Sequence, residues 1–318
     1  MGRRAVVMAM ALVVVVCAVY LRAPGRGQEQ FVDEVVNRQT VDRMRAGEGY
    51  YRAMRDSLQA NTSLPDSPRA FREPTMFVVW RLLPSAESRW VAFVLLALAA
   101  GVLTAATAST PLAGPAVALY LLHAARPRDG GLWIDQNFLT ELWSGALVVI
   151  ALSAWRRGLA RITVIMSMVA VAVRELAFPL LIGGLLASRV RRRRAVWLVA
   201  IMATIAGTGL HFVLAAQQTS SSGSQAMLLG TGGPDRLLDL AGVGFPHRTL
   251  AGAVLLALGW WRVSRDGALL RFIGPILALP LIGLAVGRDY WGFVVVPVLV
   301  VLAVEAVAAV SSPSPAHA

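Results

Sequence analysis

FVDEVVNRQTVDRMRAGEGYYRAMRDSLQANTSLPDSPRAFREPT, residues 31–75, is the one long polar stretch near the start of a chain that is otherwise mostly apolar. It lies between the first and second hydrophobic segments. It opens with the acidic pair Asp33-Glu34, carries Tyr50-Tyr51, and closes on Arg72-Glu73-Pro74-Thr75. Binding and catalytic residues are often found on loops, and here one loop is much longer than the other loops between apolar segments. We therefore expect the working site of the protein in this stretch.

The composition predicts a membrane protein. Hydrophobic residues make up 57% of the chain, charged residues 15%, and the mean hydropathy is +0.63. A soluble core cannot bury that much apolar surface. All 30 basic residues are arginines, and most stand in short runs between apolar segments. This is the pattern of cytoplasmic membrane loops, so the net charge of +12 does not indicate a nucleic-acid partner.

The arginine runs also predict the topology. The segment 5–21 follows Arg3-Arg4 and has no clear A-x-A cleavage site, so we expect an uncleaved first span with its amino end in the cytoplasm. Residues 22–75 then form the first extracytoplasmic loop. About ten crossings place both termini and every dense arginine run in the cytoplasm. The fold prediction is an all-α, multi-pass bundle in the bacterial plasma membrane, one domain over 1–310, with a disordered cytoplasmic tail over 311–318.

Apolar residues inside the polar loop recur at roughly helical spacing. They predict an amphipathic helix that lies at the membrane interface and is interrupted near Gly47 and Gly49. We expect this helix to anchor the loop rather than to carry chemistry. The residues that define its apolar side are Val41, Met44, Tyr51, Met54 and Leu58.

A second unusual stretch, 162–188, separates the basic patches 156–161 and 189–194. Because both patches favour the cytoplasm, the chain must cross an even number of times between them. A continuous helix over this stretch is about 40 Å long, which is enough for one span and too short for two. We predict two short helices that turn within the membrane at Arg174–Pro179, with Arg174 and Glu175 lining a polar cavity.

Charged residues from separate segments fall on the extracytoplasmic side of this topology. Ionisable groups in a membrane are costly and are usually functional. Arginine suits phosphate oxygens, and a carboxylate can accept the proton of an attacking hydroxyl. The catalytic candidates are Asp33, Glu34 and Glu175, and the substrate-binding candidates are Tyr51, Arg72, Arg174, Arg288, Asp289 and Tyr290.

Each candidate also has a structural alternative. Asp33-Glu34 would be a solvated helix start, Arg174-Glu175 an ion pair that closes a helix tip, Arg288-Asp289 a polar turn, and Arg72 a snorkelling arginine. The histidines show no ligand spacing, and the single Cys17 gives no cysteine site. No cofactor is therefore predicted, and a divalent metal has no support in the sequence.

Five short motifs together resemble polytopic glycosyltransferases of the GT-C type. They are the acidic pair after the first span, G-x-G-Y-Y at 47–51, R-x-P-T at 72–75, R-E-L-A-x-P at 174–179 and D-Y-W-G at 289–292. More closely, they are similar to bacterial relatives of the polyprenyl-phosphate-sugar-dependent mannosyl- and arabinosyltransferases. The resemblance implies Asp33 as catalytic base, and Arg72, Arg174 and Arg288 as contacts to the donor phosphate.

The resulting function prediction is a membrane glycosyltransferase. It would move a sugar from a lipid-linked donor, a polyprenyl phosphate, to a glycan, lipid or protein acceptor of the cell envelope on the extracytoplasmic face. The alternative is a non-catalytic polytopic protein, either a transporter or an envelope-assembly partner. A transporter is expected to show an internal repeat with paired broken helices. The sequence shows one broken region, which favours the enzyme.

Overall fold

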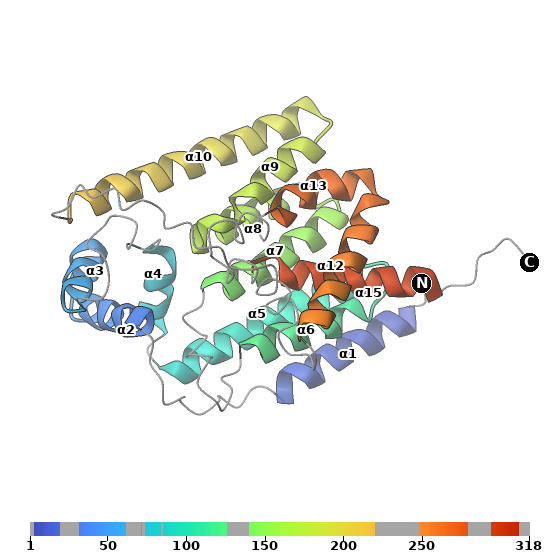
Figure 1. Ribbon diagram of the computed structural model, residues 1–318, viewed down its shortest axis with the longest axis horizontal. Helices are drawn as coiled ribbons and strands as arrows, with labels where there is room; N and C mark the ends of the chain where they lie inside the picture. Colours follow the sequence, from blue (N-terminus) through green and yellow to red (C-terminus); the bar gives the residue numbers. More distant parts are fainter. Residues whose placement is uncertain are drawn as a thin grey trace, which may run out of the picture.

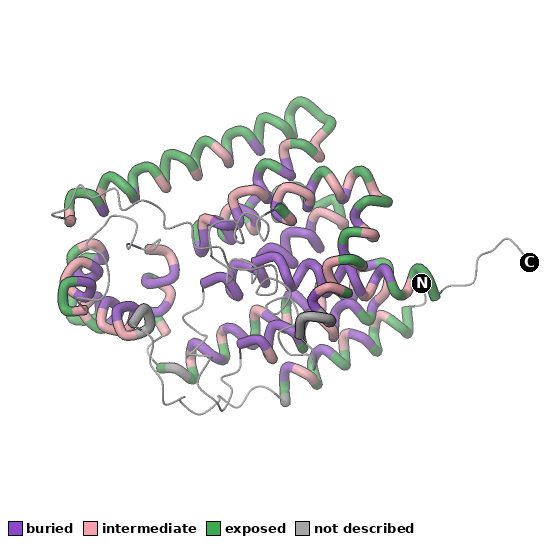
Figure 2. Tube along the Cα trace, in the orientation of Figure 1, coloured by how far each residue is buried: buried purple, intermediate pink, exposed green. Residues whose placement is uncertain are grey.

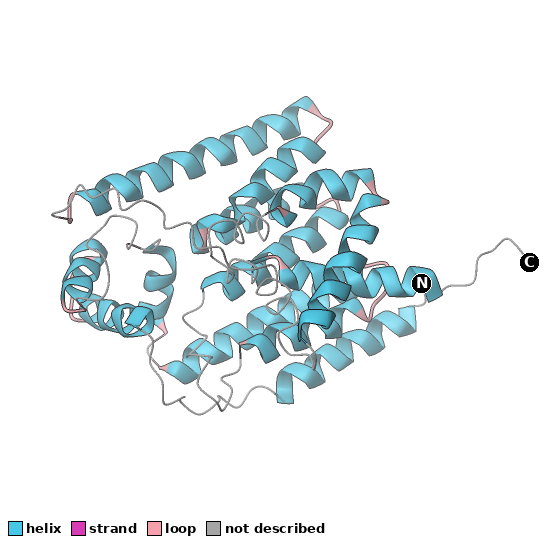
Figure 3. Cartoon of the chain, in the orientation of Figure 1, coloured by secondary structure: helices cyan, strands magenta, loops and turns pink. Residues whose placement is uncertain are grey.

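The computed structural model describes residues 3–19, 32–61, 71, 74–83, 85–125, 140–219, 248–278 and 294–311. These residues form thirteen α-helices and one 3₁₀ helix, and the described part contains no strand (Figure 3). The prediction of an all-α fold is confirmed. The elements are α1 (Arg3–Val19), α2 (Val32–Arg45), α3 (Tyr50–Gln59), α4 (Pro74–Leu82), α5 (Ala86–Thr107), α6 (Ala113–Ala124), α7 (Thr140–Arg156), α8 (Ala160–Val173), η3 (Glu175–Ala177), α9 (Phe178–Ala187), α10 (Arg191–Ala216), α12 (Arg248–Ser264), α13 (Gly267–Leu277) and α15 (Val296–Ser311).

The helices form a bundle with a smaller unit at one end. Figure 1 shows α2, α3 and α4 together at the end opposite the two chain termini. Helix α7 lies at the centre of the bundle, because every residue from Thr140 to Ala154 is buried. It packs against α5, α8 and α15. A helix that is apolar on all sides must be buried, either in protein or in a membrane, and α7 is buried in protein.

Two helices among the described residues are long and apolar enough to cross a membrane. They are Glu87–Thr107 of α5, with mean hydropathy 2.2, and Arg191–Ala216 of α10, with mean hydropathy 2.0. Several other apolar helices have only 10–17 residues. Only 17% of the apolar stretch of α10 is buried, and Figure 2 shows this helix mostly exposed along its length.

The predicted break in the stretch 162–188 is confirmed. Helix α8 ends at Val173, and Arg174 has an extended backbone with φ −152° and ψ 115°. One 3₁₀ turn, η3, leads directly into α9, and Pro179 lies in the first turn of α9. Proline is tolerated there because the first backbone N–H groups of a helix have no acceptor within it.

The helical pair α8–α9 returns to the end from which it starts. Trp155 precedes the pair and stacks on Phe272 of α13, with ring centroids 4.9 Å apart. Trp197 follows the pair and packs edge-on against the same ring at 6.4 Å. The basic patches 156–161 and 189–194 therefore lie near each other, as the prediction of two short helices that turn back requires.

Further arginines gather at this same end. Arg156 of α7 and Arg262 of α12 both reach Glu305 of α15, and Arg157 donates a hydrogen bond of 2.8 Å to the carbonyl oxygen of Ala106. The end of the bundle that carries the arginine runs is thus opposite the α2–α4 unit (Figure 1). The predicted tail lies outside the described residues except for Ser311, which ends α15 instead of joining the tail.

The interrupted helix of the polar loop is two helices, α2 and α3, and Gly47 between them has a positive φ of 99°. The expectation that its apolar side lies on the membrane surface is wrong. Tyr50, Met54 and Leu58 of α3 are buried against protein. The Tyr50 ring contacts Phe77 of α4 at 5.1 Å. The three helices cover one another's apolar sides, so little of that surface is left for lipid.

Gly183 sets the close approach of α9 to α13. A Cβ atom there would overlap the carbonyl oxygen of Phe272, whereas a Cβ at Gly207 of α10 meets nothing within 4 Å. Both residues are helical, so alanine gains the same helix propensity at each. We expect Gly183→Ala to lower the free energy of unfolding by about 1–3 kcal/mol relative to Gly207→Ala, because overpacking displaces backbone. Denaturant unfolding of the two purified variants measures the difference, and equal stabilities would contradict the close contact.

Candidate functional site

The structure describes the predicted site residues to different extents. Asp33 and Glu34 lie in the first turn of α2, where the structure describes the backbone but not these side chains. Tyr51, Arg174 and Glu175 are described in full. The candidates outside the described residues are Arg72, Arg288, Asp289 and Tyr290.

Arg174 is the centre of a buried charge cluster. Its side chain is 5% exposed and lies between two carboxylates. Nε of Arg174 is 2.9 Å from Oε1 of Glu141, and Nη1 is 3.2 Å from Oε1 of Glu175. The extended backbone of Arg174 interrupts the helix at this point and lets the guanidinium reach the start of α7. The break between α8 and α9 thus positions the cluster.

Glu141 is the member of this cluster that the sequence analysis missed. It stands in the first turn of α7, where its side chain is 4% exposed, and the Thr140 hydroxyl donates to its Oε2 at 3.3 Å. An acidic side chain is favourable at this position because the helix dipole is positive there. The available signal was a single carboxylate at the start of an otherwise apolar helix.

The two carboxylates differ in their access to solvent. The Glu175 side chain is 42% exposed, ten times the value for Glu141. Glu141 therefore neutralises Arg174 inside the protein, and Glu175 is the carboxylate that an external molecule can reach. With one arginine and two glutamates the cluster carries a net negative charge when all three are ionised. This favours the ion-pair alternative for Arg174 over the expected phosphate contact.

Tyr51 lies in a separate contact that joins α3 to α10. Its hydroxyl is 3.1 Å from Nδ1 of His211, and Nε2 of His211 is 3.4 Å from the carbonyl oxygen of Phe71. The Tyr51 ring also stacks on Phe71 with centroids 6.4 Å apart. The His211 side chain is buried, at 4% exposed, and each of its ring nitrogens has a hydrogen-bond partner. Tyr51 thus has a positioning contact in addition to its predicted role in binding.

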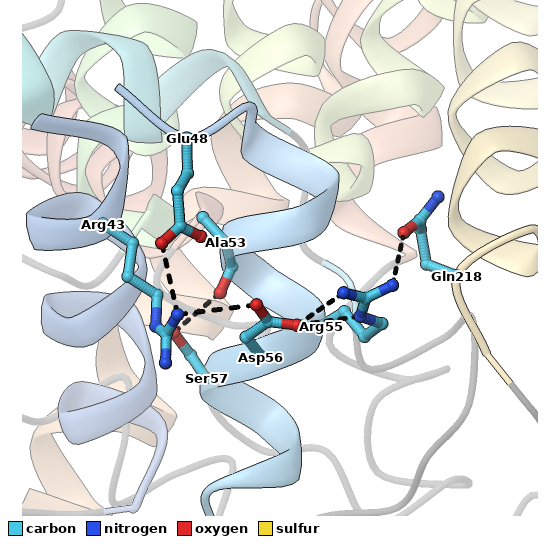
Figure 4. Close-up of polar contacts among 7 residues, drawn as sticks. All are labelled: Arg43, Glu48, Ala53, Arg55, Asp56, Ser57 and Gln218. Carbon is cyan, nitrogen blue, oxygen red and sulfur yellow. Dashed lines mark hydrogen bonds and ion pairs between the residues drawn. The ribbon is translucent and has the colours of Figure 1, made fainter. Parts of the chain in front are cut away.

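Figure 4 shows a second link between the same two helices. Arg43 of α2 lies 3.3 Å from Glu48 and 3.5 Å from Asp56, and Arg55 donates to Asp56 at 2.8 Å. Arg55 also donates to the side-chain oxygen of Gln218 at 3.4 Å. Partly exposed ion pairs of this kind contribute about 0–1 kcal/mol each. Their effect is to fix the α2–α3 turn and hold it beside the end of α10.

No group of three His, Cys, Asp or Glu side chains that could hold a metal ion occurs among the described residues. No protein-family model matches the chain, and no curated protein or solved structure is significantly similar to it. The resemblance to GT-C enzymes therefore depends on short motifs. In the described structure, one of them, 47–51, forms the α2–α3 turn, and another, 174–179, forms the helix break that carries the charge cluster.

Proposed function

We propose that this chain is a polytopic membrane glycosyltransferase that takes a sugar from a polyprenyl-phosphate donor on its extracytoplasmic face. The observation that supports it most is the accessible Glu175 carboxylate held by the buried Arg174 at a helix break. The break lies at the end of α8, and α8 packs against α4 of the polar unit. A fixed, reachable carboxylate beside a polar unit suits proton abstraction from a sugar hydroxyl.

The membrane placement is part of the same proposal. About ten crossings, with both termini in the cytoplasm, put the arginine-rich end inside and the α2–α4 unit outside. The outer surface of the bundle supports it, because large apolar side chains of α10 are exposed. Val199 is 68% exposed, Met202 63% and Leu210 59%. Such a face is unfavourable in water and suits contact with lipid chains.

In the proposed reaction, Glu175 accepts the proton of the acceptor hydroxyl. The acceptor oxygen forms a bond to the anomeric carbon of the donor sugar while the bond from that carbon to the phosphate oxygen breaks. Polyprenyl phosphate leaves with the electron pair. Arg174 orients Glu175, and Glu141 holds Arg174 in place. Arg72 and Arg288 remain the predicted phosphate contacts. The family resemblance implies Asp33 as the base instead of Glu175, so Asp33 is the competing assignment.

Transfer of a labelled sugar tests the proposed activity directly. Membranes that contain the overproduced chain are incubated with polyprenyl-phosphate sugars labelled in the sugar, and membranes from cells without the chain serve as control. We expect chain-dependent label in the acceptor fraction and release of polyprenyl phosphate. Absence of transfer from every such donor by folded protein would favour the non-catalytic alternative.

Cysteine labelling tests the topology. The single native cysteine, Cys17, is buried and is replaced by Ala to give a background without thiols. We expect Ala60→Cys, at the exposed position directly after α3, to react with an impermeant maleimide in intact cells. Val190→Cys, at a position that is 55% exposed, should react only after the membrane is permeabilised. Labelling of Val190→Cys from outside would reverse the proposed orientation.

A further inference from the structure

A run of exposed arginines marks the turn from α9 to α10, at the end of the bundle away from the α2–α4 unit (Figure 1). Positions 189 and 191–194 are all arginine, and all five are exposed. One of them, Arg194, donates from Nε to the carbonyl oxygen of Ser188 at 2.8 Å and so closes the turn. The ion pairs among the described residues include none of the five. We call residues 188–194 the arginine turn.

Other arginines at the same end of the bundle have partners inside the protein. Arg156 and Arg262 share the carboxylate of Glu305, and Arg157 donates to a backbone carbonyl oxygen. Asp266 is the other acidic residue described at this end, and it accepts from the first N–H groups of its own helix, α13. Both carboxylates already have partners, so neither compensates the charge of the arginine turn.

The position of these charges is unfavourable for the helix that carries them. The helix dipole is positive at its N-terminal end, so cations there destabilise the helix, and neighbouring like charges repel one another. The first turn of α10 contains no acidic residue, and its N-cap, Val190, makes no side-chain hydrogen bond. Nothing in the described structure offsets this repulsion, whereas an anion from outside would.

The surroundings of the arginine turn favour a lipid over a nucleic acid as the source of that anion. Val190, within the run, is exposed, and so are Leu198 and Val199 one to two turns along α10. Trp260, one turn before the end of α12, is exposed at the same end of the bundle. Arginine stems can lie along lipid chains while their guanidinium groups reach the headgroups, and tryptophan is typical of this depth. A polyanion in water offers nothing to these apolar side chains.

We propose that the arginine turn binds the headgroup phosphates of anionic phospholipids in the adjoining leaflet, while the apolar start of α10 contacts their acyl chains. Guanidinium groups offer paired donors that match phosphate oxygens. Clusters of four or more basic residues directly beside a membrane helix are typical of such binding. The inference depends on the membrane placement proposed above and not on sugar transfer.

Fluorescence anisotropy tests the preference for anionic lipid. A fluorescent phosphatidylglycerol in neutral detergent is titrated with the purified full chain. We expect unlabelled phosphatidylglycerol to displace the probe, and phosphatidylcholine with the same acyl chains to displace it much less. One arginine near an anionic surface contributes about fivefold in affinity. Arg192→Gln combined with Arg193→Gln should therefore weaken binding by about 5- to 25-fold.

A second pair of substitutions is the matched control. Arg52→Gln combined with Arg81→Gln removes two exposed arginines from the α2–α4 unit and should leave the affinity for the probe unchanged. All four arginines are exposed, so both double variants should unfold at the wild-type temperature in detergent. Equal displacement by the two lipids, or wild-type affinity in the Arg192→Gln/Arg193→Gln variant, would overturn the lipid site.

Two soluble competitors separate the lipid from other sources of phosphate. Inorganic phosphate and a single-stranded oligonucleotide are each added to the protein–probe complex at the phosphate concentration at which unlabelled phosphatidylglycerol displaces it. We expect neither to displace the probe. Displacement by inorganic phosphate would assign the turn to small anions, and displacement by the oligonucleotide would assign it to nucleic acid. Either result would overturn the lipid assignment.

Carbonate extraction of membranes that contain the chain separates failure of this inference from failure of the membrane placement. A chain released by carbonate contradicts the placement, and with it the lipid site. A chain that stays in the membrane but shows no preference for phosphatidylglycerol contradicts only the lipid site.

Discussion

We expect Glu175→Gln to lower the proposed sugar transfer by about 10²–10⁴-fold, the usual contribution of a general base. The amide keeps the shape of the side chain and an acceptor oxygen for Arg174, but it cannot accept the proton of the acceptor hydroxyl. Glutamine carries no charge. Because the side chain at position 175 is 42% exposed, water can hydrogen-bond its amide. We therefore expect normal folding with lost transfer. Initial rates with a labelled polyprenyl-phosphate donor measure the effect, and thermal unfolding in detergent measures folding.

Two variants make this result specific. Glu87→Gln in the exposed first turn of α5 removes a carboxylate far from the helix break in the sequence and should leave transfer unchanged. Asp33→Asn tests the base that the family resemblance implies. Full activity in Glu175→Gln together with loss of transfer in Asp33→Asn would assign the base to Asp33. The reverse pattern would assign it to Glu175.

Much of the fold followed from two simple physical arguments. Hydropathy predicted the first apolar span over 5–21, and the structure has α1 over Arg3–Val19. The requirement that two basic patches share one side predicted the break at Arg174, which the structure contains. The long-range contacts of Trp155 and Trp197 with Phe272 could not be predicted from the sequence, because ring contacts between distant segments leave no periodic pattern.

The candidate site was less predictable than the fold. Arg174 and Glu175 were found because charged residues are rare in apolar segments. Glu141 was missed because its role depends on a partner about thirty residues away. A single carboxylate at the start of an apolar helix also fits a solvated helix start, so this local signal did not identify the partner. The amphipathic side of α3 was assigned to lipid for a similar reason. Periodicity shows that Met54 and Leu58 share a face, but not that α2 and α4 cover it.

Glu305 was also missed, although its carboxylate contacts three partners at the arginine-rich end. It is the acidic residue of an apolar helix, α15, and is 1% exposed. Nη2 of Arg156 lies 2.8 Å from its Oε2, and Nε of Arg262 lies 3.5 Å from the same atom. The backbone N–H of Ser109 donates to Oε1 at 2.8 Å. One carboxylate therefore joins the α5–α6 turn to the ends of α7, α12 and α15.

Glu305→Ala should destabilise the protein by about 3–5 kcal/mol, because it leaves the charge of Arg156 without its buried partner. It also leaves the Ser109 N–H without its acceptor. Glu305→Gln keeps an acceptor oxygen, so we expect a smaller loss. The free energy of unfolding, measured by titration of the purified protein with denaturing detergent, gives both values. Glu87→Ala is the matched surface control and should stay within about 0.5 kcal/mol of wild type.

The two arginine partners of Glu305 predict which of their variants loses more stability. A general loss of packing would not predict this difference. Arg156 is 12% exposed and 2.8 Å from Glu305, whereas Arg262 is 23% exposed and 3.5 Å away. A shorter and drier ion pair is the stronger one. Arg156→Ala should therefore destabilise the protein more than Arg262→Ala. Combined with Glu305→Ala, Arg156→Ala should cost much less than the sum of the two single changes, because the second removes a charge already left unpaired. Additive losses would show that the contact contributes through packing alone.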